Sequence, residues 1–214
     1  MKRLQMKSHG TTGTLITFCG LDGCGKTTMI KLLKEKLEHE GEKVYLTKQP
    51  TSPVRQSKMF RTYMDEENHE KYDYHALSLL AASDRVQHCA QSIFAALNRG
   101  ETVICDRYFY SCLANLRARG YTREKWIYEV SKWIPKPDLA FFLDVPVEVA
   151  IARVRERPEE KERYIDEALQ YRLEKEYKTI CRKNSGISIP ANQGIVSAFE
   201  EIKAIVDDYR KTEG

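Results

Sequence analysis

Short apolar runs alternate with longer stretches of helical periodicity along most of the chain. The apolar runs are rich in β-branched and aromatic residues, which is typical of strands. They predict strands at residues 14–18, 43–47, 102–105, 139–143 and 187–189. Between them, apolar residues recur every three or four positions and predict helices at residues 26–40, 74–98, 109–117, 123–133, 147–155, 164–184 and 195–209. Strands alternating with helices favour a parallel sheet covered on both faces, so we expect a three-layer α/β fold.

Three segments lack this pattern. Residues 1–12 are basic without an apolar stretch, and we expect a flexible N-terminal leader there rather than a secretory signal. Residues 50–53 contain two prolines and predict a turn-rich connection. The charged stretch 156–162 predicts a lid at about residues 153–163, with a solvated surface loop as the alternative. Because no shift in composition marks a second domain, residues 13–214 are expected to form one domain.

Composition limits the possible partners. At 42% apolar residues the chain can bury a core, and no apolar run approaches the roughly 18 residues of a membrane helix. The net charge of +4 is small and its basic residues are mixed with acidic ones, so neither a membrane nor a nucleic-acid partner is expected. Six cysteines without a C-x-x-C pair indicate reduced thiols in a cytoplasmic protein.

The clearest motif is Gly20-Leu-Asp-Gly-Cys-Gly-Lys-Thr27, which follows the first predicted strand and opens a helix. It matches G-x-x-x-x-G-K-[ST], in which backbone N–H groups surround phosphate oxygens at a helix N-terminus. Lys26 is predicted to bridge the β- and γ-phosphates, and the Thr27 hydroxyl to bind Mg²⁺. The predicted ATP-binding residues are Gly20, Leu21, Asp22, Gly23, Cys24, Gly25, Lys26, Thr27 and Thr28.

A second group of polar residues follows the third predicted strand. Asp106 and Arg107 lie at the carboxyl edge of the sheet, where doubly wound folds bind ligands. The Arg107 guanidinium is suited to a second phosphoryl group, although an ion pair between Asp106 and Arg107 is the alternative. On the preceding helix, Asp84 and Arg85 share one face with Ala81. We expect Arg85 to donate to a base carbonyl with Asp84 orienting it, and a surface charge pair is the alternative.

Four segments resemble the successive motifs of the thymidylate kinase family, in order and spacing. They are residues 18–28, 79–88, 103–108 with Ser111, and 137–146, and the resemblance covers about residues 14–209. It implies transfer of the ATP γ-phosphoryl group to dTMP or a related nucleoside monophosphate, with Mg²⁺ as cofactor. It also implies strand order 2-3-1-4-5 and a homodimer.

The resemblance assigns roles to individual residues. In the implied acceptor site, Arg107 binds the phosphate and Arg85 reads the base; the whole set is Asp22, Lys48, Arg55, Ala81, Arg85, Asp106, Arg107, Ser111 and Asn115. Thr27, Asp22 and Asp106 are the implied metal residues. The family supplies a catalytic arginine either from the phosphate loop or from the lid. Because the loop position is Gly23, the chain resembles the lid type, with Arg153, Arg157 and Arg163 as candidates.

Three departures from the family fall in the acceptor pocket. Ala81 stands where the family has a phenylalanine that stacks on thymine, and Asn115, followed by Leu116, stands where an aromatic residue lies beside the sugar. The family's Arg-Glu-Pro-Gly-Gly loop is replaced by residues 48–52, with Arg55 as a stand-in phosphate contact. We hypothesise that the chemistry is retained while the acceptor is larger than thymine or carries a ribose hydroxyl that Asn115 binds.

Other classes of nucleotide-binding protein remain to be weighed. A GTP-dependent switch needs an Asn-Lys-x-Asp segment, and the sequence has none. A deoxynucleoside kinase, whose acceptor carries no phosphate, would use a different sequence from Asp106-Arg107-Tyr108. A nucleotide-binding regulator that keeps the phosphate loop without turnover stays open because the acceptor pocket is altered.

Overall fold

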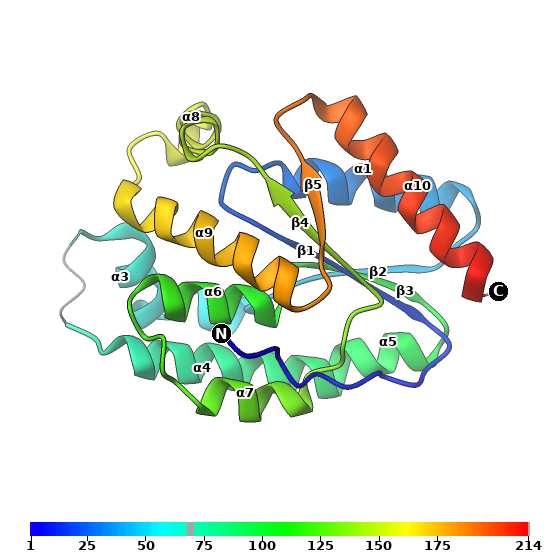
Figure 1. Cartoon of the computed structure of the whole chain (residues 1–214), viewed down its shortest axis with the longest axis horizontal. Coiled ribbons are helices and arrows are strands. Elements are labelled where there is room, and N and C mark those ends of the chain that lie inside the picture. The colour runs from blue at the N-terminus through cyan, green and yellow to red at the C-terminus, as the bar shows by residue number, and fades with distance from the viewer. Residues whose placement is uncertain (68–70, 214) are drawn as a thin grey trace.

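Five parallel strands form one sheet in the order β2-β3-β1-β4-β5 in the computed structural model, which describes residues 1–67 and 71–213 (Figure 1). The strands are β1 Thr14–Cys19, β2 Val44–Lys48, β3 Thr102–Asp106, β4 Leu139–Asp144 and β5 Ile187–Pro190. The strand order implied by the resemblance to the thymidylate kinase family is thus confirmed. All five residues of β3 are buried, as in a strand covered on both faces.

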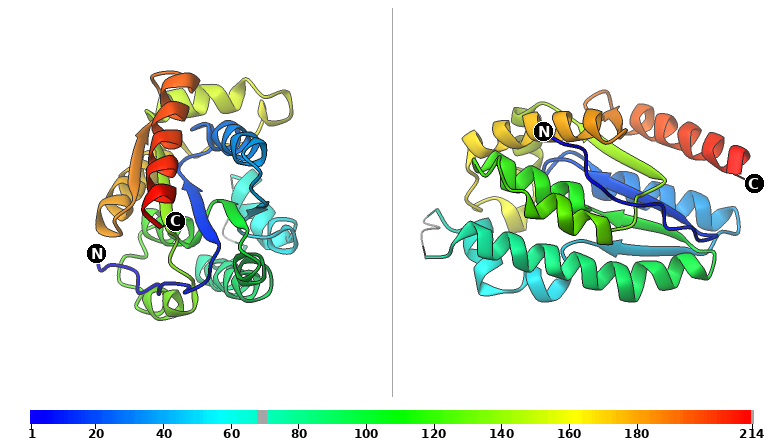
Figure 2. Two further views of the ribbon diagram at one scale, coloured as in Figure 1. Left: turned by 90° about the vertical axis from the view of Figure 1, so that its right-hand side faces the viewer. Right: turned by 60° about the horizontal axis from the view of Figure 1, so that its bottom comes forward.

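Helices cover both faces of the sheet (Figure 2). On one face α1 (Lys26–His39) packs against the central strands and against α10 (Ile195–Glu213). The other face carries α4 (Tyr74–His88), α5 (Phe94–Asn98), α6 (Phe109–Ala118) and α9 (Glu167–Lys183). The short helices α7 (Trp126–Val130) and α8 (Val147–Arg155) complete the arrangement predicted from periodicity. No helix among the described residues is long and apolar enough to cross a membrane.

Two predicted helices differ in detail. The helix predicted at 74–98 is α4 and α5 joined by a π-helical turn, Cys89–Ile93. The helix predicted at 123–133 is shorter, because it starts at Trp126 and ends in the 3₁₀ turn Ser131–Trp133.

Two helices that the sequence analysis did not predict follow β2. They are α2 (Ser52–Arg55) and α3 (Lys58–Asp65), where residues 50–53 were expected to form turns only. Pro53 at the start of α2 suits the first turn of a helix, because the amide that proline lacks would have no helical partner there. The Ser57 side chain caps α3 by accepting from the Phe60 amide at 3.2 Å. The two helices place side chains from this connection at the sheet's carboxyl edge.

The N-terminal segment is docked on the domain, in contrast to the flexible leader expected from its composition. Leu4 is buried, and its amide donates to Oδ1 of Asn184 at 2.9 Å. Lys7 forms a parallel bridge with Pro135, and the His9 ring lies 2.8 Å from the Asp138 carboxylate. Backbone groups and single polar side chains make most of these contacts. They therefore produce no periodic pattern of apolar residues from which docking could be predicted.

If Leu4 anchors this segment, Leu4→Ala lowers the free energy of unfolding by roughly 2 kcal/mol, the lower end for a buried leucine truncation. Urea denaturation followed by circular dichroism measures the change. Lys2→Ala, at an exposed position of the same segment, is the control and leaves the midpoint unchanged. Equal midpoints for Leu4→Ala and the wild type would show that the segment does not dock in solution.

Candidate active site

The loop between β1 and α1 has the backbone of a phosphate cradle. Gly23 and Gly25 have φ angles of 81° and 98°, in the left-handed region that favours glycine. A Cβ atom at Gly23 would lie 2.1 Å from the carbonyl oxygen of Ala150, so any side chain there would push α8 away. Lys26 opens α1 and is buried, and its Nζ donates to the carbonyls of Gly20 at 3.2 Å and Leu21 at 2.7 Å. The ammonium group thus rests on the loop's own oxygens.

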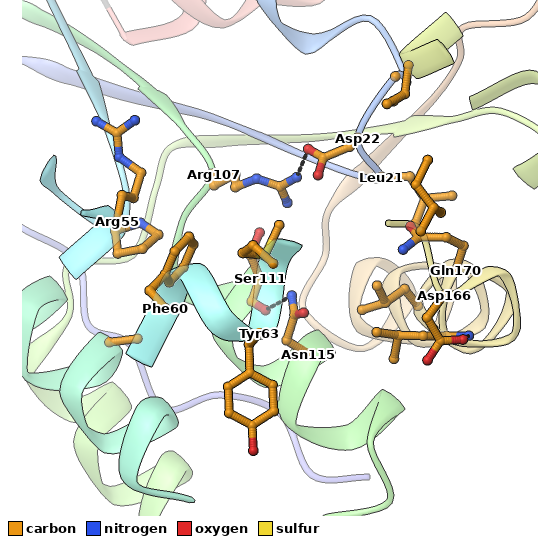
Figure 3. A pocket seen from close by; sticks show the side chains of 18 of the residues that line it. Leu21, Asp22, Arg55, Phe60, Tyr63, Arg107, Ser111, Asn115, Asp166 and Gln170 are labelled. Atoms are coloured by element: carbon orange, nitrogen blue, oxygen red, sulfur yellow. Dashed lines mark hydrogen bonds and ion pairs between the residues drawn. The ribbon is translucent and has the colours of Figure 1, made fainter. Parts of the chain in front are cut away.

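The end of β3 turns an arginine toward this loop. Arg107 has a φ of 64°, which is uncommon for a residue with a side chain, and its amide donates to the Phe18 carbonyl at 2.8 Å. Its guanidinium donates to Oδ1 of Asp22 at 2.5 Å (Figure 3). It also donates to the Gly20 carbonyl at 3.2 Å and to the Tyr177 hydroxyl at 3.0 Å. The guanidinium therefore faces the glycine loop across the ends of β1 and β3.

The ion pair considered as an alternative, between Asp106 and Arg107, is not formed. Asp106 instead pairs with Lys48 at 2.8 Å, because these residues lie opposite each other in the register of β2 and β3. Burial would raise the pKa of Asp106, but Lys26, Arg107 and Lys48 outweigh it and lower the pKa.

Asp22 interacts with positively charged side chains from three parts of the chain. Its two carboxylate oxygens pair with Arg107 and, at 3.3 Å, with Arg163 from the charged segment after α8. Burial opposes ionisation, yet Arg107, Lys26 and Arg163 together hold the pKa of Asp22 well below its usual range. The charged segment predicted to be a lid thus touches the phosphate loop.

A cavity of about 380 Å³ lies between the loop, the end of β3 and helices α3, α4, α6 and α9. Most of the predicted site residues line it. They are Leu21, Asp22, Gly23, Gly25, Lys26, Thr27, Lys48, Arg55, Ala81, Arg85, Asp106, Arg107, Ser111, Asn115, Arg157 and Arg163. A phosphate loop and a second cluster of cations therefore share one hollow.

Four predicted residues do not line this cavity. Gly20 and Cys24 belong to the loop but do not face the cavity, since Cys24 is fully buried and Gly20 borders a separate small hollow beside Phe142 and Leu143. Thr28 is exposed on α1. Arg153 donates to the Ala191 carbonyl at 3.3 and 3.4 Å, outside the cavity lining.

Side chains on α4 and α6 have partners that the sequence did not predict. Asp84 does not orient Arg85, since its carboxylate accepts from the amide of Thr51 at 2.8 Å and from the Thr51 hydroxyl. Arg85 folds back on its own helix and donates to the Ala81 carbonyl at 2.7 Å. Asn115 donates to the Ser111 carbonyl at 2.9 Å. Asp84 therefore holds the loop before α2, whereas Arg85 lies in the cavity wall.

The cavity wall formed by α3 and the start of α9 was not predicted from the sequence. Phe60, Tyr63 and Met64 come from α3, and Tyr164 and Gln170 come from the α9 side. Ser57 followed by apolar residues at 59, 60, 63 and 64 is the available signal, because a capping serine before this spacing is typical of a helix start.

Two of the three residues predicted to bind the metal, Thr27 and Asp106, are suited to a magnesium ion. Within residues 1–67 and 71–213, no three His, Cys, Asp or Glu residues gather to hold a metal ion. Magnesium delivered with a nucleotide needs only one or two protein ligands besides phosphates and water. Thr27 is exposed on the cavity wall, and Oδ1 of Asp106 is buried without a hydrogen-bond partner. Asp22 fits less well, because both its oxygens pair with arginines.

The sheet order, glycine loop and buried lysine define an α/β nucleotide-binding protein of the P-loop class. Beyond this class, the chain belongs to the thymidylate kinase family, whose model matches residues 18–202. It is a nucleoside monophosphate kinase.

Named relatives agree with the family match. A probable thymidylate kinase of Pyrococcus horikoshii is 44% identical over 147 residues, which cover 68% of this chain and 71% of the relative. A probable thymidylate kinase of Thermococcus gammatolerans is 33% identical over 91% of this chain and 96% of its own. A thymidylate kinase of Citrifermentans bemidjiense is 36% identical over 74% of each chain.

The charges around Asp22 predict a pH-dependent effect of Asp22→Asn. Because its pKa is lowered in the folded state, the carboxylate contributes stability above its unfolded pKa of about 4, and loses it as the pH falls toward the folded value. We expect the difference in urea midpoint between the wild type and Asp22→Asn to be largest above about pH 5 and to shrink between about pH 4 and 2.

Glu35→Gln is the matched control, because its pair with Lys31 at 3.8 Å is exposed and such pairs contribute little. Its midpoint should follow the wild type at each pH. A difference for Asp22→Asn that stays constant over the same range would contradict the assigned charge interactions.

Proposed function

We propose that the protein transfers the γ-phosphoryl group of ATP to dTMP or a related nucleoside monophosphate. The observation that carries this proposal is the shared cavity, in which Lys26 and the glycine loop face Arg107 and its neighbours. One anion-binding end suits the donor phosphates, and the other suits a phosphorylated acceptor. The names of the relatives support dTMP as the first acceptor to test.

At the donor end, Lys26 can exchange its hydrogen bonds to loop carbonyls for hydrogen bonds to phosphate oxygens. Lys26 Nζ donates to the carbonyls of Gly20 and Leu21. Phosphate oxygens are stronger acceptors for an ammonium group than neutral carbonyls are. Binding of ATP therefore draws Lys26 onto the β- and γ-phosphates while the loop amides surround them.

The acceptor end offers cations for a phosphate and a donor for a base. Lys48, Arg55 and Arg107 line the cavity on the β2 and β3 side. Buried Arg85 is a pure hydrogen-bond donor, so the base edge that it meets must present acceptors such as ring carbonyls. Asn115 has one amide hydrogen beyond its bond to Ser111, which is suited to a sugar hydroxyl.

Arg163 is the lid arginine best placed to act. Arg157 and Arg163 both line the cavity and both pair with Glu160, at 3.4 and 2.7 Å, but Arg163 also reaches Asp22 of the phosphate loop at 3.3 Å. Arg153 binds the Ala191 carbonyl. A guanidinium here would stabilise charge that develops on the transferred phosphoryl group. The same segment would exclude water from the closed cavity.

The transfer breaks the bond between γ-phosphorus and its bridging oxygen and forms one to an oxygen of the acceptor phosphate, giving ADP and a nucleoside diphosphate. The chain's residues hold the two phosphates in line, and the acceptor oxygen needs no strong general base. Thr27 and Asp106 would hold Mg²⁺, which when bound neutralises the donor phosphates. We place this enzyme in the cytoplasm as a homodimer.

Purified protein with Mg-ATP, assayed against the common ribo- and deoxyribonucleoside monophosphates by ADP release, tests the proposal. We expect turnover with at least one monophosphate. Tight binding of ATP and a monophosphate without product would favour a nucleotide-binding regulator. Turnover of unphosphorylated nucleosides alone would favour a deoxynucleoside kinase.

Loss of either central cation is expected to remove a transition-state contact. Lys26→Ala and Arg107→Ala should each lower kcat/KM by at least about 100-fold, a typical scale for one such contact. Lys31→Ala, exposed on α1, is the control and keeps wild-type kinetics. Near-normal activity of either cavity variant, with an unchanged circular dichroism spectrum, would refute its role.

The three lid arginines are expected to differ. Arg163→Ala should lower kcat by about 1000-fold, the scale of a catalytic arginine in related systems, and Arg153→Ala by less than about tenfold. Single-turnover rates at saturating ATP and acceptor make the comparison. A larger loss for Arg153→Ala than for Arg163→Ala would reverse the assignment.

A further inference from the structure

The part of the α4 wall next to Arg85 offers no flat surface to a nucleobase. Tyr74 and Leu77 line the cavity at the start of α4, but the side chains between them and Arg85 that face the cavity are the small Ser78 and Ala81. Nε of Arg85 is buried and has no hydrogen-bond partner among the described residues. This wall is therefore suited to the hydrogen-bonding edge of a base, and the ring face must meet another element.

Most aromatic rings of the cavity are already engaged. Tyr63 and Tyr74 pack edge to face at 5.0 Å, and the Arg119 guanidinium lies 4.4 Å from the Tyr74 ring centre. Figure 3 shows the Tyr63 hydroxyl pointing away from the cavity. The Tyr177 hydroxyl donates to Ser111 and accepts from Arg107, so its position is fixed beside the Arg107 guanidinium.

Phe60 differs from these rings. It is half-buried on α3, it lines the cavity, and it makes no ring–ring contact among the described residues. In Figure 3 its side chain lies on the same side of the cavity as Arg55, with Leu21 and Gln170 on the far side. The Ser57 hydroxyl accepts from the Phe60 amide, which fixes the backbone of the residue that carries this ring.

We propose that Phe60 is the ring on which the acceptor base stacks, so that it determines acceptor binding. This inference rests on the proposed function. With the face of the base against α3, its edge is directed at Arg85 on α4. The stacking surface is thereby supplied by α3, and the alanine at position 81 on α4 leaves space for the base.

Kinetics of Phe60→Leu and Phe60→Tyr test the assignment, using the monophosphate that the wild type phosphorylates best. Loss of a stacked base contact corresponds to roughly 5- to 150-fold in affinity. We expect Phe60→Leu to raise the KM for the monophosphate within this range and to leave the KM for ATP unchanged. Phe60→Tyr, which keeps the ring, should restore the wild-type KM.

Two further variants sharpen the result. Phe94→Leu removes a half-buried ring on α5, outside the cavity, and should leave both KM values unchanged. Tyr164→Leu tests the other candidate ring, in the segment next to Arg163. If Tyr164→Leu raised the acceptor KM and Phe60→Leu did not, the base would stack on the lid side and our inference would be wrong.

Direct binding separates this inference from the proposed function. Phe60→Trp places an indole at the site, and a stacked base should quench its fluorescence when monophosphate is added without ATP; Trp126→Phe and Trp133→Phe in the same protein remove the two native tryptophans. Absence of quenching by a monophosphate that isothermal titration shows to bind would overturn the stacking role. If the wild type phosphorylated no monophosphate, the proposed function would fall, whatever the quenching showed.

Discussion

The contact between Asp22 and Arg107 is the interaction on which the site depends. It joins the glycine loop after β1 to the turn after β3, and these neighbouring strands end at the same edge of the sheet. Without a counter-charge, Arg107 would be a mostly buried cation facing Lys26 and Arg163 across a small hollow. Asp22 balances these cations and lets three elements keep positive groups within one cavity.

The phosphate loop could be predicted because it is local, whereas the strand order was implied by the resemblance to the thymidylate kinase family. The glycines, Lys26 and the preceding strand are contiguous, and parallel β-α units leave few topologies. The partners of single charged side chains could not be predicted in this way. Asp84 and Arg85 are adjacent on α4, yet Asp84 bonds to Thr51 because of where the chain returns after β2. The path of the chain after β2 depends on tertiary packing rather than on helical periodicity.

Short elements were missed for a different reason. Helix α3 spans eight residues and follows a proline-rich connection, so its apolar stripe is too short to stand out in the sequence. The docked N-terminal segment has almost no stripe, since Leu4 is its one buried apolar side chain and backbone groups make most of its contacts. The N-terminal segment bears on stability, whereas α3 forms part of the cavity wall. Because α3 was missed, motifs alone describe the donor end of the cavity better than the acceptor end.

The docked N-terminal segment has a practical consequence for handling the protein. Its backbone connects Asn184 at the end of α9, Ser131 at the end of the α7 region and Pro135 before β4. A truncation that starts at β1 would delete these contacts, which form a strap joining segments far apart in the sequence. A tag at the opposite end, after α10, leaves that strap intact.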